Sequence, residues 1–176
     1  MVRTARRILN SRGGHRTVLV AVLLATVVLA SGNTCGPGTS NVPAQDLLAQ
    51  INAKRAAAGC QAVAGDEQLR VAAERHALDM RDHEAVRSDP NHGGSDGSTP
   101  QQRITDAGFK PASRTGEIMY YATGAPGNTV QANIDWWMNS PRHKAIIEDC
   151  AYTHAGVGLV YPGGTQWYST VDFAAH

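Results

Sequence analysis

The order of helix-like and strand-like segments constrains the fold of this chain more than any other sequence feature. Segments with helical spacing of apolar residues come first, and segments with strand patterns come last. Residues 155–161 are apolar, a Pro-Gly-Gly turn follows at 162–164, and residues 166–174 alternate, with one face carrying Trp167, Ser169, Val171 and Phe173. Helices followed by a hairpin predict an α+β fold with a small antiparallel sheet.

The helical segments are marked by their end signals. Residues 44–58 carry apolar side chains at helical spacing, and Gly59 ends that helix. Asp66 can cap a second helix that runs to about His83, and Thr99-Pro100 starts a short third helix, because threonine caps and proline suits the first turn. Further segments are predicted as a strand at 114–122, a helix from Asn128 or Thr129 to Met138, and a helix starting at Ser140.

The first 32 of the 176 residues are predicted to be a signal peptide. They combine a basic start, an apolar run at 17–29 that is shorter than the roughly 20 residues of a membrane span, and small residues at 30–32. An uncleaved N-terminal anchor is the alternative, and lipidation of Cys35 is another, for which Asn33 and Thr34 fit poorly. Residues 33–43 are predicted to be a linker, so one domain remains at 44–176.

Charge limits the partners of the exported chain. The sequence has 16 Lys and Arg against 15 Asp and Glu, and five of the arginines and no acid lie in residues 1–32. The mature chain therefore carries 11 basic and 15 acidic residues, a net charge of −4. This disfavours nucleic acid as a partner, because binding the phosphate backbone requires a basic face. It also leaves no polybasic anchor for an anionic lipid surface.

The three cysteines predict one disulfide. Export implies an oxidising compartment, and three cysteines allow one intramolecular bond with one left over. Cys60 directly follows the first helix and Cys150 follows the helix that starts at Ser140, whereas Cys35 lies in the linker. We therefore expect a Cys60–Cys150 bond, with Cys35 free or in an intermolecular bond.

A series of short motifs runs through residues 44–176 in a fixed order: Asn52-x-x-Arg55, Leu69-x-x-Ala72-Ala73-x-x-His76-Ala77-x-Asp79-Met80, His92-x-x-x-Asp96-Gly97-Ser98, Arg103-x-x-x-Ala107-Gly108-Phe109, Gly116-Glu117-Ile118, Trp137-x-x-Ser140-Pro141-x-His143 and Gly156-Val157-Gly158. In this order they resemble the CAP superfamily (cysteine-rich secretory, antigen 5 and pathogenesis-related 1 proteins) in its short bacterial, SCP-like form. The resemblance implies a three-layer α-β-α sandwich and a secreted protein. It implies no shared catalytic reaction, and several members are implied to bind sterols or fatty acids.

Three residues are the candidates for a metal-capable cleft. Ser140, Pro141 and Arg142 place His143 at the third position of a helix, where the positive end of the helix dipole favours a neutral imidazole. His92 lies in a glycine-rich loop, and Glu117 opens a strand, where a buried carboxylate needs a partner such as either histidine. We expect the three side chains to converge within about 4–6 Å, close enough to shift each other's pKa.

The resemblance adds a comparison for this cleft. In eukaryotic members the cavity uses two histidines and two glutamates, and His92 corresponds to one of those histidines. The second glutamate falls at Ser140 here, so at most three of the four residues are present, and Ile118 replaces the asparagine of the Gly-Glu-Asn motif. Two His and one Glu can bind Zn²⁺ or a similar divalent ion, but weakly, because the ligand shell is incomplete.

Three functions remain open at this point. The first is a secreted binding module for lipids, sterols or cell-wall material. The second is a metal-assisted hydrolase that uses Zn²⁺ on His92 and His143, with Glu117 as ligand or general base. The third is a structural wall or host-interaction protein with a vestigial cleft. A Ser140–His143–Glu117 triad is disfavoured because the Ser140 hydroxyl is expected to cap a helix.

Overall fold

The computed structural model describes residues 42–161 and 164–176. The predicted signal peptide, Cys35 and the Pro-Gly part of the hairpin turn lie outside the described residues, as does nearly all of the linker. Helix α1 begins at Val42, so the last two residues assigned to the linker belong to this helix. None of the helices in the described ranges is long and apolar enough to cross a membrane.

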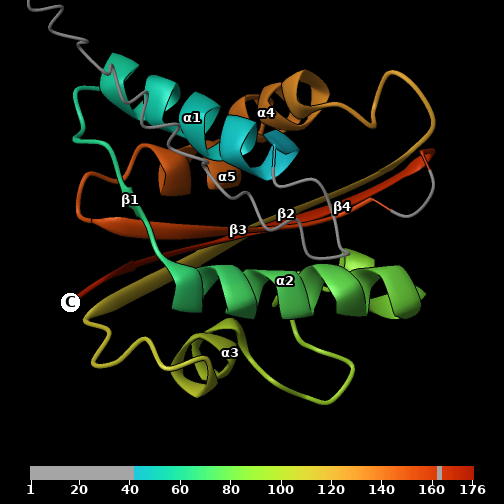
Figure 1. Ribbon diagram of the computed structural model, residues 1–176, viewed down its shortest axis with the longest axis horizontal. Coiled ribbons are helices and arrows are strands. Elements are labelled where there is room, and N and C mark those ends of the chain that lie inside the picture. The colour runs from blue at the N-terminus through green and yellow to red at the C-terminus, as the bar shows by residue number, and fades with distance from the viewer. Residues whose placement is uncertain (1–41, 162–163) are drawn as a thin grey trace, which may run out of the picture. The chain divides into compact units, whose positions relative to one another are not determined.

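Four strands form one sheet in the order β1-β3-β4-β2 (Figure 1). Strand β4 is central and antiparallel to both of its long neighbours, whereas β1 pairs in parallel with β3. The sheet is therefore mixed, not purely antiparallel as predicted, because the two-residue β1 has no sequence pattern that marks a strand. The strand bounds are β1 Ala64–Gly65, β2 Arg114–Thr123, β3 His154–Val160 and β4 Gln166–Ala175.

Helices cover both faces of this sheet, which confirms the α+β class and the three-layer α-β-α arrangement (Figure 1). One face carries α1 (Val42–Ala57), α4 (Val130–Asn139) and α5 (Pro141–Ile147). The other face carries α2 (Glu67–Asp82), the 3₁₀ helix η1 (Glu84–Ser88) and α3 (Pro100–Asp106). The side-chain caps of α2, α3 and α4 are the predicted ones, with Asp66, Thr99 and Thr129 each accepting a backbone N–H from the first turn.

The core is built on both faces of β4. Trp167, Val171 and Phe173 belong to the core cluster shared with α1, α4 and α5, whereas Tyr168 and Ala174 belong to clusters under α2. Helix α2 approaches β3 so closely that a Cβ atom added at Gly156 would lie 2.0 Å from the Arg70 backbone nitrogen. A Cβ at Gly158 would lie 2.2 Å from the backbone nitrogen of Glu74. The Gly156-Val157-Gly158 motif is therefore a contact surface for the helix.

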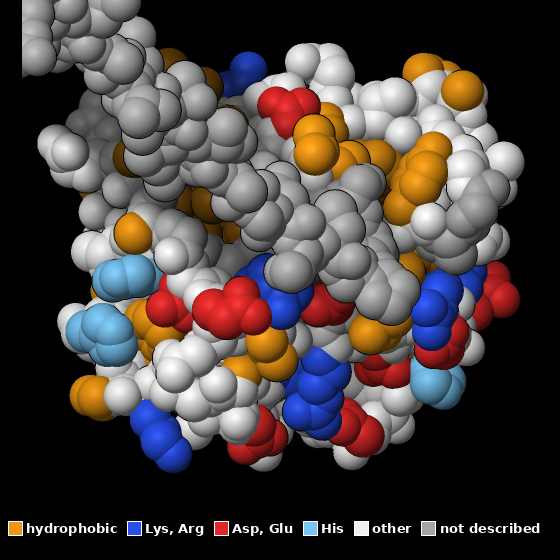
Figure 2. Space-filling model, in the orientation of Figure 1, with side chains coloured by type: hydrophobic (Ala, Val, Ile, Leu, Met, Phe, Trp, Pro, Cys, Tyr) orange, Lys and Arg blue, Asp and Glu red, His pale blue; other side chains and the backbone are white. Residues whose placement is uncertain are grey.

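The outer surface of α2 carries charges of both signs. On the face drawn in Figure 2, basic and acidic side chains are interspersed. Along α2 they form ion pairs, with Arg70 contacting Glu67 at 2.7 Å and Glu74 at 2.6 Å, and Arg81 contacting Asp82 at 2.6 Å. Exposed pairs of this kind contribute little to stability, so the apolar face of α2 is what holds it to the sheet.

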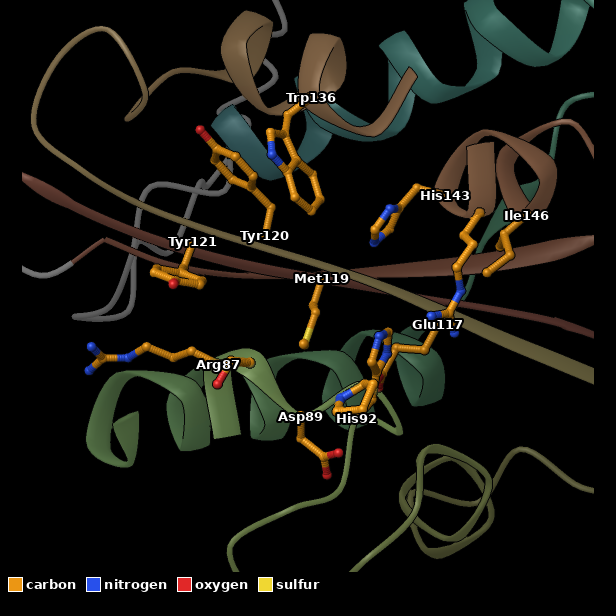
Figure 3. A pocket seen from close by; sticks show the side chains of 13 residues that line it. Arg87, Asp89, His92, Glu117, Met119, Tyr120, Tyr121, Trp136, His143 and Ile146 are labelled. Atoms are coloured by element: carbon orange, nitrogen blue, oxygen red, sulfur yellow. The ribbon is translucent and has the colours of Figure 1, made fainter. Parts of the chain in front are cut away.

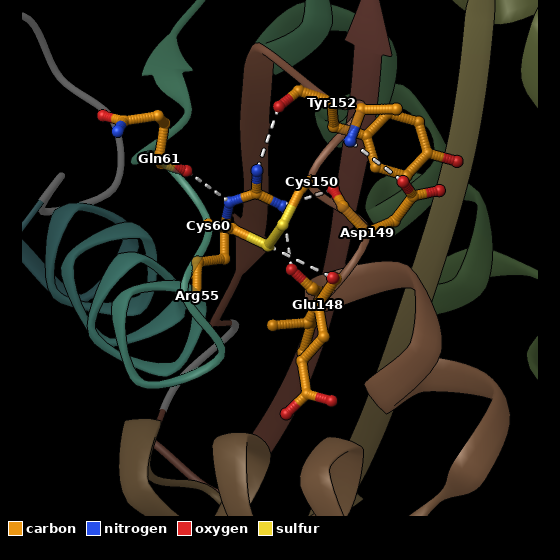
Figure 4. Close-up of a disulfide and its surroundings, with 9 residues drawn as sticks. Arg55, Cys60, Gln61, Glu148, Asp149, Cys150 and Tyr152 are labelled. Atoms are coloured by element: carbon orange, nitrogen blue, oxygen red, sulfur yellow. Dashed lines mark hydrogen bonds between the residues drawn. A yellow bond between two sulfur atoms is a disulfide. The ribbon is translucent and has the colours of Figure 1, made fainter.

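The end of α1 is fixed to the segment between α5 and β3. Arg55 is fully buried and donates to the backbone carbonyls of Gln61, Ile147, Asp149 and Tyr152 at 2.8–3.1 Å (Figure 4). Asn52 exchanges two hydrogen bonds with the backbone of Val63, at 2.9 and 3.1 Å. The Cys60–Cys150 disulfide joins the same two segments, with the Cα atoms 4.9 Å apart. The predicted disulfide is confirmed, and the Asn52-x-x-Arg55 motif ties α1 to the neighbouring backbone.

Candidate functional site

A cavity of about 440 Å³ lies between β2, the α4–α5 pair and the loop that follows η1 (Figure 3). His92, Glu117 and His143 all line it, whereas Ser140 does not. The structure thus brings three of the four predicted site residues to one cavity. The full lining is Arg87, Ser88, Asp89, Pro90, His92, Glu117, Met119, Tyr120, Tyr121, Trp136, Arg142, His143 and Ile146.

His92 is held in an unusual backbone conformation. Its φ angle is 54°, and within the described ranges no other non-glycine residue has a positive φ. The Asp89 carboxylate fixes the turn by accepting the backbone N–H groups of Asn91 at 2.9 Å and Gly93 at 2.8 Å. Arg103 donates to the His92 carbonyl at 2.9 Å. Strained backbone of this kind costs free energy and is typical of functional sites, so the loop is built to aim this imidazole.

Glu117 is buried and fully engaged. His92 donates from Nδ1 to its Oε1 at 2.9 Å, and Arg103 donates from Nη2 to both oxygens, at 3.1 and 2.9 Å. Burial acts to raise the pKa of Glu117, but the hydrogen bonds from His92 and Arg103 and the positive charge of Arg103 bring this pKa below its ordinary value. Glu117 is therefore a carboxylate at neutral pH, and it fixes the orientation of the His92 ring.

Two further titratable residues lie behind Glu117. His76 is fully buried, its Nε2 lies 3.8 Å from Glu117 Oε1, and its ring lies 6.5 Å from the His92 ring. Burial lowers the pKa of His76, so the ring is neutral. Asp172 faces Glu117 across the β2–β4 pair, and burial followed by the charge of Glu117 raises the pKa of Asp172 well above its ordinary value. Asp172 therefore carries a proton.

Sequence reasoning missed this supporting set of Arg103, His76 and Asp172. His76 lies on the buried face of α2, where a histidine at helical spacing reads as a core residue, and it contacts the site as well. Arg103 lies on α3 and offers no local sign that it is buried. Asp172 offers a signal, because an acid stands in the middle of a strand whose other residues are almost all apolar, hydroxyl-bearing or aromatic.

His143 lies on the opposite side of the cavity from His92 (Figure 3). Its Nδ1 lies 2.7 Å from the Ser140 hydroxyl oxygen, and its ring packs at a tilt of 55° against Trp136, with the ring centres 4.8 Å apart. Burial, together with the positive charge of Arg142, lowers the pKa of His143 to about 4. This low pKa agrees with the predicted neutral imidazole, and burial is its largest cause.

The prediction that the Ser140 hydroxyl caps a helix is wrong. It is the N-cap residue of α5 by backbone position, but its side chain makes no capping hydrogen bond. Its hydroxyl contacts Nδ1 of the His143 ring instead. Ser140 lies outside the cavity lining and Glu117 binds His92 instead of His143. The three residues therefore do not form a catalytic triad.

The two cavity histidines share one feature that suits metal binding. In each ring Nδ1 is held by a neighbour, Glu117 or Ser140, and Nε2 has no hydrogen-bond partner among the described residues. Glu117 does not complete a three-ligand set, because Arg103 engages both of its oxygens. Within residues 42–161 and 164–176, no cluster of three or more His, Cys, Asp and Glu side chains is arranged to hold a metal ion. The cavity therefore offers a metal ion two protein ligands, Nε2 of His92 and Nε2 of His143.

The remainder of the cavity is largely apolar. Trp136 and Tyr121 are 49% and 48% exposed although both are large aromatic residues, and Met119 and Tyr120 complete this part of the lining (Figure 3). Arg87 lies at the same end, but it is held by the carbonyls of Met80 and Arg81 at 2.6 and 2.9 Å. The cavity therefore joins an aromatic half to a polar half that contains the histidines.

Comparisons with known proteins agree with this architecture. The chain is similar in structure to an outer surface protein from Borrelia burgdorferi, with 20% identity, 81% of this chain and 99% of that chain covered, and a TM-score of 0.67. It is similar to an extracellular protein containing a SCP domain from Bacillus anthracis, with 22% identity, a TM-score of 0.64 and 81% of this chain covered, but only 45% of that chain. The structure of NaASP2 with Zn²⁺ is 13% identical, with 79% and 82% coverage and a TM-score of 0.54.

These three likenesses, all under 25% identity, show the fold. No curated protein is matched by this sequence. Residues 48–173 match the family described as "CAP: Cysteine-rich secretory protein family". This match covers most of the chain and contains both cavity histidines, Glu117 and the two cysteines of the disulfide. The chain belongs to the cysteine-rich secretory protein (CAP) family.

Proposed function

We propose that this chain is an extracellular binding module whose cavity holds the apolar part of a lipid or sterol between Tyr121 and Trp136. The observation that carries the proposal is the aromatic half of the cavity. Two half-exposed aromatic side chains stand beside Met119 and Tyr120, in a cavity whose volume of about 440 Å³ lies within the usual range for ligand pockets. Aromatic residues that line a concave surface offer a large apolar contact area to a ligand.

The polar half suits the other end of such a ligand. The neutral His143 ring and the carboxylate-held His92 ring each leave Nε2 available to a hydroxyl or a water molecule. A ligand with an apolar body and a polar end matches both halves. Cell-wall material is included in the proposal where it carries a lipid portion. We assign no catalytic residue.

Export is supported by three observations. The predicted signal peptide precedes the domain, and the Cys60–Cys150 disulfide suits an oxidising compartment. Two structural relatives are described as an outer surface protein and an extracellular protein.

Metal binding is a second and weaker candidate function. It is favoured by the way Nδ1 is held in both histidines, since metal-binding histidines usually donate their other nitrogen to a nearby acceptor. The structural likeness to NaASP2, whose structure is described with Zn²⁺, is in keeping with it. With two nitrogens and no free carboxylate, we expect weak binding. The same shortage weighs against a Zn²⁺-assisted hydrolase, which needs three protein ligands and an open position.

The test measures ligand binding by the mature protein. A soluble fatty acid, a sterol and a peptidoglycan fragment are titrated while native mass spectrometry and tryptophan fluorescence are recorded. We expect the apolar ligands to bind and Trp136→Ala to weaken them about tenfold, since tenfold corresponds to about 1.4 kcal/mol and aromatic contacts are of that size. Val71→Ala is the matched control, because Val71 is 45% exposed and lies outside the cavity lining.

The outcomes separate the candidates. If neither apolar ligand binds, or if Trp136→Ala and Val71→Ala behave alike, the lipid proposal is wrong. A Zn²⁺ titration of the wild type and of His92→Ala/His143→Ala decides the metal candidate, which is rejected if the two proteins bind equally.

A further inference from the structure

A second cavity adjoins the first at the histidine end. It has a volume of about 420 Å³ and shares Pro90, His92, Glu117 and Arg142 with the first cavity. Its own lining is polar, in contrast to the aromatic half of the first cavity. That lining consists of Asn91, Thr99, Pro100, Gln101, Thr115 and Gly116. The binding surface therefore continues past His92, from an aromatic part through a junction to a part rich in hydrogen-bonding groups.

Arg142 is the charged residue at this junction. It lies in the first turn of α5, is exposed, and lines both cavities. Within the described residues it makes no hydrogen bond or ion pair, whereas Arg87, the other basic residue of the lining, is held by two backbone carbonyls. Its charge reaches the site, because it is one of the charges that lower the pKa of His143.

The negative charges near Arg142 are already engaged. Glu117 lines both cavities but is paired with Arg103 at 2.9 Å behind the surface. Asp89 lines the first cavity but not the second. Its two oxygens accept the backbone N–H groups of Asn91 and Gly93. The guanidinium of Arg142 is therefore the one basic group at the junction, among the described residues, whose donors are open to a ligand.

We infer that the ligand is an anionic amphiphile in which a phosphodiester links an apolar chain to a hydroxyl-bearing head group. This inference rests on the proposed function. The apolar chain lies in the aromatic half of the first cavity, the phosphate contacts Arg142, and the head group occupies the second cavity. Arginine suits phosphate because its planar guanidinium donates two parallel hydrogen bonds.

A phosphodiester fits better than a carboxylate for a geometric reason. A fatty-acid carboxylate ends the molecule, so a ligand that placed it at Arg142 would leave the second cavity without contacts. A phosphodiester continues on both sides of its charge and fills both cavities. The hydroxyl and amide side chains of Gln101, Asn91 and Thr115 can then bind the hydroxyls of the head group.

The experiment compares three ligands with the same acyl chain, below their critical micelle concentrations. Lysophosphatidylglycerol carries the phosphodiester and a glycerol head group, the free fatty acid carries a charge without a head group, and the monoacylglycerol carries no charge. Dissociation constants are measured for the wild type, Arg142→Gln, Trp136→Ala and Lys144→Gln. Lys144 is the matched control, because it is an exposed base two residues along α5 that lines neither cavity.

We expect the wild type to bind the phosphodiester at least about tenfold more tightly than the monoacylglycerol, in the range of one charge-assisted hydrogen-bonded contact. Arg142→Gln should reduce this preference to about twofold or less without changing monoacylglycerol binding, and Lys144→Gln should leave the preference intact. The preference should also shrink as the salt concentration rises, because Arg142 is exposed.

Each alternative result has a separate meaning. If all three ligands bind equally in the wild type and in Arg142→Gln, the inference is overturned and the proposed lipid-binding function stands. If the fatty acid binds as tightly as the phosphodiester, the head-group part is overturned. If no ligand binds, or if Trp136→Ala has no effect on any of them, the proposed function itself fails.

Discussion

Two buried arginines on opposite faces of the sheet are held in different ways. Arg55 on α1 is fully buried and donates to four backbone carbonyls, beside the Cys60–Cys150 disulfide. Arg103 on α3 is 2% exposed and contacts the Glu117 carboxylate and the His92 carbonyl. The first arginine is surrounded by peptide groups that cannot titrate, whereas the second belongs to a cluster of titratable side chains next to a cavity.

The two regions also differ in how completely their polar atoms are satisfied. No Arg55 atom is left without a partner, but several buried atoms around Arg103 have none among the described residues: both ring nitrogens of His76, Arg103 Nε, Thr170 Oγ1 and both Asp172 oxygens. Buried polar atoms are rarely left unsatisfied, because each one costs about 1–3 kcal/mol. The Arg55 region is therefore built for stability, and the Arg103 region gives up stability to keep titratable groups behind the cavity.

The largest effect should come from breaking the Arg55 region. Arg55→Met removes the donors of four carbonyl groups and should lower the free energy of unfolding by about 3–5 kcal/mol, as for other broken buried polar networks. Urea unfolding followed by circular dichroism measures this change. Ligand affinity of the folded fraction should remain unchanged.

Lys54→Met on the same helix is the control, because the Lys54 side chain makes no hydrogen bond or ion pair among the described residues. It should alter stability by less than about 0.5 kcal/mol. An Arg55→Met protein as stable as this control would show that water replaces the guanidinium without cost.

A double-mutant cycle tests the Arg103 region. Arg103→Met leaves the Glu117 carboxylate buried with a weaker set of partners, which should cost about 2–3 kcal/mol. Adding Glu117→Gln removes the buried charge, so the double variant should recover about 1–2 kcal/mol of that loss. Arg55 donates to backbone carbonyls and forms no ion pair within the described residues, so no second substitution should rescue Arg55→Met. Additive losses in the cycle would show that Arg103 and Glu117 are not coupled.

Much of the fold was predictable because it depends on local signals. The caps at Asp66, Thr99 and Thr129 place three helix starts within a residue, and the position of Cys60 and Cys150 at element ends predicts the disulfide. The parallel pairing of β1 was not predictable. Its two residues, Ala64 and Gly65, become a strand through contacts with His154 and Ala155, which lie far away in the sequence.

The candidate site was predictable only in part, for a similar reason. His92, Glu117 and His143 stand beside glycines or a helix start, which are features that a sequence displays. The buried partners of Glu117 come from α3, α2 and β4, and each one is set by tertiary packing. The role of the Ser140 hydroxyl also depended on side-chain geometry, since the backbone pattern of an N-cap is the same whether the hydroxyl caps the helix or contacts His143.

Asp172→Asn should stabilise the protein at neutral pH. Burial and the charge of Glu117 raise the pKa of Asp172, so the folded protein must hold a proton that the unfolded chain releases above about pH 3.9. Stability is therefore lost as pH rises from about 3.9 towards the folded pKa, and asparagine removes this loss. We expect a gain of about 1–2 kcal/mol at pH 7 and none below about pH 3.9, measured by urea unfolding across pH. An equal change at both pH values would contradict a protonated Asp172.

The smallest expected change in the free energy of unfolding comes from the protonation of His143. It would make the cavity region, unlike the Arg55 region, sensitive to pH. Its folded pKa of about 4 lies below the ordinary value near 6.5, so the neutral ring stabilises the fold above about pH 6.5 and this contribution is lost as pH falls towards 4. Because the ring is only half buried, we expect a loss of about 1 kcal/mol, which His143→Gln should abolish. NMR titration of the His143 ring gives the midpoint directly.

Burial is the largest cause of the shift in the His143 pKa. Trp136→Ala, which opens the ring to water, should therefore raise this pKa more than Arg142→Gln, which removes one neighbouring charge. The reverse order would mean that charge, and not the aromatic wall, controls this imidazole.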